Sequence, residues 1–128
     1  MIKLAVDTMG GDLGSVEVVS AIKEFLRTNT DVEITAVGKI EELKELDGIC
    51  RVIDARDVVP MNASALEVMR MKESSMMKAI RLVKDEALDG VVSCGSTGAF
   101  LSASTIILKR VVLPAPFGPT IPTIAPAG

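Results

Sequence analysis

The sequence predicts an α/β fold, in which a mostly parallel sheet carries helices on both of its faces. Short apolar runs alternate four times with helical segments along the 128 residues, as is typical of parallel strands joined by crossover helices. Hydrophobic residues make up 48% of the chain and charged residues 24%, which suits the core of a single domain. Glycine-rich turns follow the first and the last apolar run. Because such sheets bind ligands at the carboxyl ends of their strands, these turns form one candidate site.

The first half of the chain contains three of the four expected strands, at residues Ile2–Val6, Val32–Val37 and Ile49–Ile53. A helix over residues 15–27 has apolar residues at helical spacing, namely Val18, Val19, Ile22, Phe25 and Leu26. We expect a short charged helix over residues 40–46, ended by Asp47 and Gly48.

The second half begins with a long helical region over residues 64–88. Ser64 and Glu67 have the spacing of a capping box, and residues 72–75 predict a break because serine can cap a new helical turn. The fourth strand is expected at residues 90–92 and a last helix at residues 98–109. The apolar positions of the long region follow helical spacing: Leu66, Met69, Met76, Ile80, Val83 and Ala87.

Residues 111–128 differ from residues 1–110, which we take as the α/β portion. No charged residue follows Arg110, and five of the six prolines lie here, at positions 114, 116, 119, 122 and 126. This spacing is incompatible with a regular helix or a central strand. Three interpretations stay open: an extended or disordered tail, the start of a larger domain that has been cut off, and an altered reading frame from about Val111.

Composition argues against several classes of protein. The net charge is −3 and aromatic residues make up 2%, so we expect no nucleic-acid partner. The chain has no histidine, and Cys50 and Cys94 lack metal-ligand spacing, so we expect no metal site and two ordinary thiols, with a disulfide as the alternative. The sequence has neither a secretory signal nor an apolar stretch of transmembrane length, which predicts a soluble, cytoplasmic protein.

The first glycine-rich turn contains Asp7, Gly10, Gly11 and Asp12. Its glycines allow a ligand to approach the backbone, and the free N–H groups of a strand-to-helix turn can hold an anion such as phosphate. The alternative is that Asp7 and Asp12 only cap the turn and the helix. The turn lacks the GxGxxG pattern of dinucleotide-binding proteins.

The second glycine-rich turn contains Ser93, Gly95, Ser96, Thr97 and Gly98. Two hydroxyls and several N–H groups at a helix start form a neutral anion cradle, and a simple capped helix start is the alternative. The lysine of a P-loop is missing, which disfavours nucleotide hydrolysis. Cys94 has the position of a nucleophile but no histidine to activate it.

The predicted helix break supplies two weaker candidates for the site, Lys72 and Ser74, with a solvated kink as the alternative. The methionines around the break are better explained as core filling or as a subunit contact than as ligands: Met69, Met71, Met76 and Met77.

Four motifs occur together in a recognisable order: DTMGGD at residues 7–12, VG at 37–38, MKESSM at 71–76 and SCGSTGA at 93–99. Over residues 1–110 the chain resembles the N-terminal part of the bacterial phosphate acyltransferases of phospholipid synthesis, the PlsX type. The resemblance implies an incomplete three-layer α/β/α fold like that of isocitrate and isopropylmalate dehydrogenases.

The resemblance also implies a reaction, the transfer of a fatty acyl group from acyl carrier protein to inorganic phosphate, giving acyl phosphate. It implies a homodimer without metal or organic cofactor, in peripheral contact with a membrane acyltransferase. Phosphate would lie at the two glycine-rich turns; the catalytic residues stay unknown.

The chain departs from the family pattern at residues 13–15, where His-Ala-Pro is usual, and at Cys94 and Ser96, where alanine and asparagine are usual. Residues 61–65, just before the long helical region, lack the two acidic residues and the proline that are usual there in the family. Family members are more than twice as long, so we expect this chain alone to be inactive and to associate. The alternatives are a non-catalytic α/β module that binds phosphate or a partner, and, by fold analogy alone, a dehydrogenase-like domain.

Overall fold

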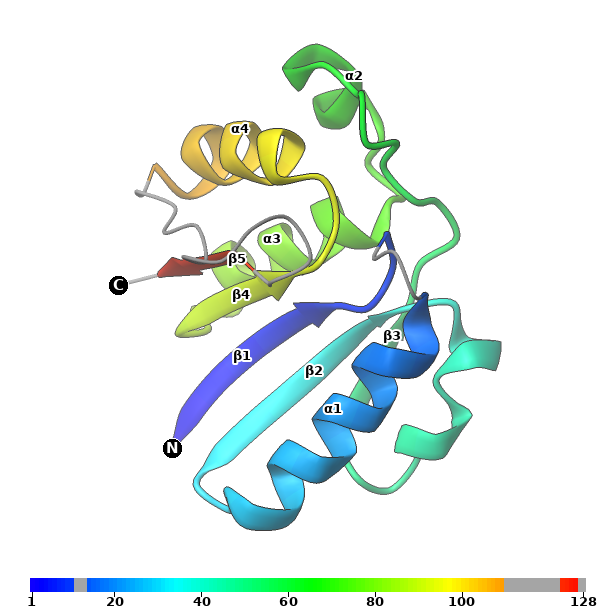
Figure 1. Ribbon diagram of the computed structural model, residues 1–128. Helices are drawn as coiled ribbons and strands as arrows, with labels where there is room; N and C mark the ends of the chain where they lie inside the picture. Colours follow the sequence, from blue (N-terminus) through cyan, green and yellow to red (C-terminus); the bar gives the residue numbers. More distant parts are fainter. Residues whose placement is uncertain (11–13, 110–122, 127–128) are drawn as a thin grey trace.

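A five-stranded sheet runs through the centre of the computed structural model, which describes residues 1–10, 14–109 and 123–126 (Figure 1). The strand order is β3-β2-β1-β4-β5. The first four strands along the chain pair in parallel, and the last is antiparallel to β4 at the edge of the sheet. Their bounds are β1 Ile2–Asp7, β2 Val32–Gly38, β3 Arg51–Asp54, β4 Gly90–Ser93 and β5 Thr123–Pro126.

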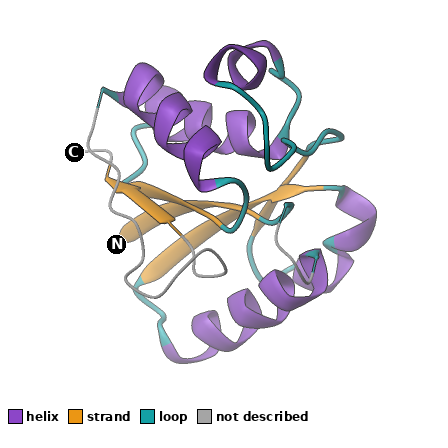
Figure 2. Ribbon diagram, turned by 45° about the horizontal axis from the view of Figure 1, so that its top comes forward, coloured by secondary structure: helices purple, strands orange, loops and turns teal. Residues whose placement is uncertain are grey.

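Helices cover both faces of this sheet, which confirms the predicted α/β class (Figure 2). One face carries α1 and two single 3₁₀ turns, and the other carries α2, α3 and α4. Side chains alternate along each strand, so that Val6 packs toward α1 while Ala5 packs toward α3. The bounds are α1 Ser15–Thr28, η1 Ile40–Glu42, η2 Lys44–Leu46, α2 Ala65–Arg70, α3 Ser75–Asp85 and α4 Thr97–Leu108.

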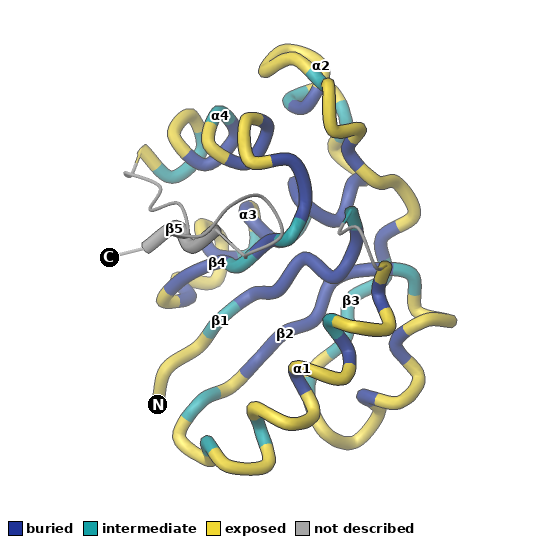
Figure 3. Tube along the Cα trace, in the orientation of Figure 1, coloured by how far each residue is buried: buried dark blue, intermediate teal, exposed yellow. Residues whose placement is uncertain are grey.

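The carboxyl-terminal halves of the central strands β1 and β2 and the inner side of α3 are buried (Figure 3). Met76 and Met77 lie in the larger of the two hydrophobic clusters, and Met69 and Met71 pack at its border. These methionines therefore fill the core, as one of the two sequence interpretations has it. Among the described residues, no helix has both the length and the apolar character required to cross a membrane.

The predicted helix break is confirmed. The capping box of Ser64 and Glu67 starts α2, and a separate helix α3 starts after Ser74, whose hydroxyl accepts a hydrogen bond from the Met77 N–H at 3.2 Å. The break lets the Ser75 N–H donate to the Asp57 carbonyl at 3.0 Å, so the chain after β3 is joined to the start of α3.

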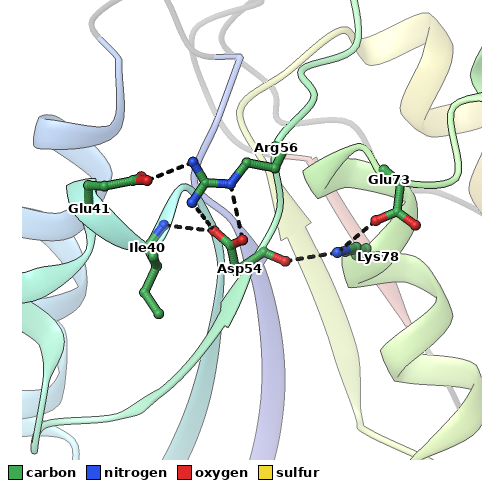
Figure 4. A network of polar contacts seen from close by, with 6 residues as sticks. All are labelled: Ile40, Glu41, Asp54, Arg56, Glu73 and Lys78. Carbon is green, nitrogen blue, oxygen red and sulfur yellow. Dashed lines mark hydrogen bonds and ion pairs between the residues drawn. The ribbon is translucent and has the colours of Figure 1, made fainter.

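A network of ion pairs holds the segment that follows β3 (Figure 4). The Arg56 guanidinium donates to both oxygens of Asp54 and to Glu41. The Lys78 ammonium donates to the Asp54 carbonyl at 2.9 Å and pairs with Glu73. The pairs are exposed except at Lys78, which is partly buried, so their main effect is to orient this segment beside the start of α3 rather than to stabilise the fold.

Three sequence predictions were wrong in detail. Residues 40–46 form two 3₁₀ turns instead of one helix, with N–H groups bonded three residues back. Phe25 and Leu66 are 41% and 61% exposed, so they lie outside the apolar faces assigned to them. The helix expected to reach residue 88 ends at Asp85, because Ala87 has φ +53° and turns the chain into β4.

Residues 110–122 and 127–128, which include most of the proline-rich segment, lie outside the described residues. Its one described element, β5, is an edge strand, a position where proline is tolerated. The division of the chain at residue 110 stays a prediction.

Candidate functional site

The two glycine-rich turns meet at the carboxyl edge of the sheet. β1 and β4 are neighbours, and their last residues, Asp7 and Ser93, lie side by side in the pairing register. The turns that follow are in backbone contact, because a Cβ atom at Gly10 would lie 3.2 Å from the Gly95 Cα. Gly10 itself has φ +89°, a conformation that favours glycine. The tertiary structure thus joins two segments of distant sequence into one site.

Asp7 connects the two turns through hydrogen bonds. Its Oδ1 accepts from the Met9 N–H at 3.0 Å, which holds the first turn. Its Oδ2 accepts from the Ser93 hydroxyl at 2.9 Å, and that hydroxyl accepts from the Gly95 N–H at 3.1 Å, which holds the second turn. One carboxyl group therefore sets the geometry of both turns. Through its bond to Met9, Asp7 also caps the first turn, as the alternative interpretation of the sequence has it.

The Asp7 carboxyl is deeply buried, and Asp7 as a residue is 1% exposed. Burial raises the pKa of Asp7 to about 6, although the nearby Ser75 hydroxyl and the bonds from Met9 and Ser93 offset part of the effect. Ser75, in the first turn of α3, is also 1% exposed, and its hydroxyl has no hydrogen-bond partner of acceptable geometry among the described residues. Ser75 stood outside the predicted site, because a serine at a helix start carries no signal that it faces a buried acid.

The second turn leads into α4 with its N-terminus partly open. The Ser96 hydroxyl accepts from the Ala99 N–H at 3.3 Å and donates to the Met61 carbonyl at 3.2 Å, so it caps the helix and holds the segment before α2. Thr97 and Gly98 follow it on the exposed side of the first turn. Within the described part of the chain, their N–H groups find no protein acceptor. An open first turn of this kind can receive an anion.

The remaining candidates belong to the helix break, to the first turn and to the cysteines. Lys72 is exposed at the break between α2 and α3, and the Ser74 hydroxyl is engaged in capping α3. Gly11 and Asp12 lie outside the described residues. Both cysteines are free and half-buried, and burial raises the pKa of the Cys94 thiol, which disfavours a thiolate nucleophile there. Within the described ranges, no group of three or more His, Cys, Asp or Glu residues could hold a metal.

The buried acid gives the fold a pH dependence. The pKa of Asp7 rises from 3.8 to about 6 on folding, so the folded state binds more protons than the unfolded state between these values. Lowering the pH from 7 to 5 should therefore stabilise the natural chain relative to Asp7→Asn by about 1 kcal/mol. Urea unfolding of both proteins at pH 7, 6 and 5 measures this difference. A difference that does not change with pH would contradict the burial argument.

Comparison with known proteins places the chain in a family. A family model described as "Fatty acid synthesis protein" matches residues 2–126. The chain belongs to this family. It is 41% identical over 117 residues to a protein of Clostridium tetani named phosphate acyltransferase, which covers 85% of this chain. Proteins of the same name from Mycoplasma capricolum and Thermosipho melanesiensis are 34% and 35% identical and cover 95% and 87% of it.

The alignments cover 35%, 39% and 34% of these three relatives, so the chain spans about a third of the length of the curated proteins that it matches. The family assignment agrees with the resemblance inferred from the four motifs.

Proposed function

We propose that the joined glycine turns bind inorganic phosphate as one substrate of an acyl-transfer reaction. The observation that carries this proposal is the backbone contact between Gly10 and Gly95, which brings the first turn beside the open N-terminus of α4. The name of the relatives, phosphate acyltransferase, supports phosphate as the anion.

In the proposed reaction, a phosphate oxygen attacks the carbonyl carbon of a fatty acyl thioester carried by acyl carrier protein. A C–O bond forms, the C–S bond breaks, and the thiol leaves with a proton, giving acyl phosphate for phospholipid synthesis. The residues proposed to position the phosphate are Gly10, Gly95, Ser96, Thr97 and Gly98, while Asp7 and Ser93 hold the turns. Fixed N–H donors at such a site would stabilise the charge that develops on the carbonyl oxygen. Gly11 and Asp12 are proposed to belong to the same site.

Further parts of the proposal rest on the family alone: a cytoplasmic homodimer that works without a cofactor and makes peripheral contact with a membrane acyltransferase. The second candidate function is a non-catalytic module that binds phosphate or a partner. It is favoured by the first turn of α4, whose free N–H groups need no catalytic residue in order to hold an anion.

Two measurements on the 128-residue chain test the phosphate site and the acyl-transfer activity. Phosphate at millimolar concentration should raise the melting temperature in a concentration-dependent way, since a ligand of the folded state stabilises it. Acyl transfer from acyl-acyl carrier protein to phosphate can be followed by the phosphate-dependent release of the carrier's free thiol, and we expect little or no product from this chain alone. Stabilisation without product is the result expected of this chain under both candidate functions, and it supports the phosphate site that they share. Robust product formation would overturn the expected inactivity, and no phosphate-dependent shift would overturn the phosphate site.

A further inference from the structure

The buried carboxyl of Asp7 lies beside Gly95, two residues before the free N–H groups of Thr97 and Gly98 that the proposed anion would contact. Its Oδ2 would be 3.7 Å from a Cβ atom placed on Gly95, and it reaches the Gly95 N–H through the Ser93 hydroxyl. An anion bound at this turn would thus add negative charge close to a buried carboxylate. At low local dielectric, such like-charge repulsion is strong and favours the neutral acid.

The structure also contains a partner for the added proton. Both carboxyl oxygens already accept a hydrogen bond, one from Met9 and one from Ser93, and each oxygen keeps a further lone pair. The Ser75 hydroxyl lies beside the carboxyl and is buried without a hydrogen-bond partner among the described residues. A serine hydroxyl can donate to a carboxylate or accept from a carboxylic acid, so Ser75 suits either protonation state of Asp7.

We infer that anion binding at the glycine turns is coupled to the uptake of a proton by Asp7, with Ser75 accepting the hydrogen bond of the new acid. This inference rests on the proposed phosphate site. The coupling would let a dianion bind beside a buried acid without leaving two negative charges close together. It also means that the affinity for the anion falls as the pH rises above the range where Asp7 can take up a proton.

Among the described groups that surround Asp7, we expect Asp7 itself to take up the proton. β4 brings Ser93 and the Cys94 thiol, whose pKa is raised first by burial and then by the charge of Asp7. α3 brings Ser75, and β2 brings the apolar Val37 as the pairing neighbour of Asp7. The ammonium of Lys78, also on α3, is directed to the Asp54 carbonyl and to Glu73 instead.

Calorimetry with sulfate tests the coupling, because sulfate stays a dianion near neutral pH whereas phosphate itself titrates. Sulfate is titrated into the 128-residue chain at pH 6.5 in two buffers of different ionisation enthalpy. The difference in observed heat gives the number of protons taken up. If a bound anion raises the pKa of Asp7 by about one unit, roughly 0.5 proton should be taken up per sulfate.

Three variants make the test specific. Asp7→Asn should bind sulfate without proton uptake, and Ser75→Ala should show reduced uptake because the new acid lacks its acceptor. The control is Asp89→Asn, an exposed acid that accepts from the Lys3 N–H at the opposite end of β1, and it should show the same uptake as the natural chain. If the Asp7 variant does not fold, the ¹³C shift of the Asp7 carboxyl in the natural chain, titrated with and without sulfate, gives the same answer.

The outcomes separate the inference from the proposed function. Uptake that is lost in Asp7→Asn and kept in Asp89→Asn supports the coupling. Sulfate binding without proton exchange, or an Asp7 carboxyl that titrates identically with and without sulfate, overturns the coupling and leaves the anion site intact. If neither sulfate nor phosphate binds, the proposed phosphate site itself is wrong.

Discussion

Replacing Gly38 with alanine is expected to destabilise the fold by about 3 kcal/mol, because the new methyl group would meet buried atoms that cannot easily move. Gly38 ends β2, and a Cβ atom there would overlap the Thr8 hydroxyl and lie 3.4 Å from the Met9 Cγ. Thr8 cannot move aside easily, because it is fully buried and its hydroxyl donates to the Val37 carbonyl at 3.0 Å.

A double-mutant cycle identifies the cause of this loss. Thr8→Ala removes the overlapping oxygen, so the free energy of unfolding lost in Gly38→Ala should be smaller when Thr8→Ala is also present. Urea unfolding of the four proteins provides the numbers. Gly98→Ala is the matched control, since a Cβ there meets nothing within 4 Å, and it should not destabilise the chain. Strict additivity of the two changes would exclude the overlap as the cause.

Replacing Gly10 with alanine is expected to have the largest effect on the proposed site. The new side chain would sit at φ +89° and place a Cβ 3.2 Å from the Gly95 Cα. Backbone atoms of the second turn would then have to move, since no flexible side chain lies between them. We expect a loss of stability of about 2 kcal/mol and a loss of at least about tenfold in phosphate affinity, because misplacing the donors of an anion site weakens every bond to the anion.

Gly48→Ala controls for the strain of the backbone alone. Gly48 has φ +80°, lies in an exposed turn before β3, and would place its Cβ in open space. It should lose about 1 kcal/mol of stability and keep its affinity for phosphate. Thermal shifts against phosphate concentration measure both quantities for both variants. Equal phosphate affinity in the Gly10 and Gly48 variants would mean that the contact between the turns does not form the binding site.

Much of the fold could be predicted because its signals are local. The apolar runs of β1 and β2, the capping box at Ser64 and the break before Ser75 depend on residues a few positions apart. The glycine-rich turns could be found for the same reason, since a turn that follows an apolar run needs only short-range information.

Other features could not be predicted because distant segments decide them. Leu43 and Leu46 are both fully buried. Their spacing of three residues suits the 3₁₀ turns, which place both side chains on one side. A hydrophobic period read over seven residues does not distinguish such turns from a short α-helix. Leu66 follows helical spacing yet is 61% exposed, and helical spacing alone does not show which apolar positions another element covers.

By itself, the sequence determined that two glycine-rich turns end two strands of a parallel sheet, and that these turns resemble those of a known enzyme family. Only the tertiary structure decided that the turns touch and share one buried acid. Asp7 and Ser93 are 86 positions apart along the chain, and they meet because the crossover connections place β1 and β4 side by side. The burial that raises the pKa of Asp7, and the position of Ser75 beside it, come from the packing of α3 on that sheet, and no local pattern of residues encodes them.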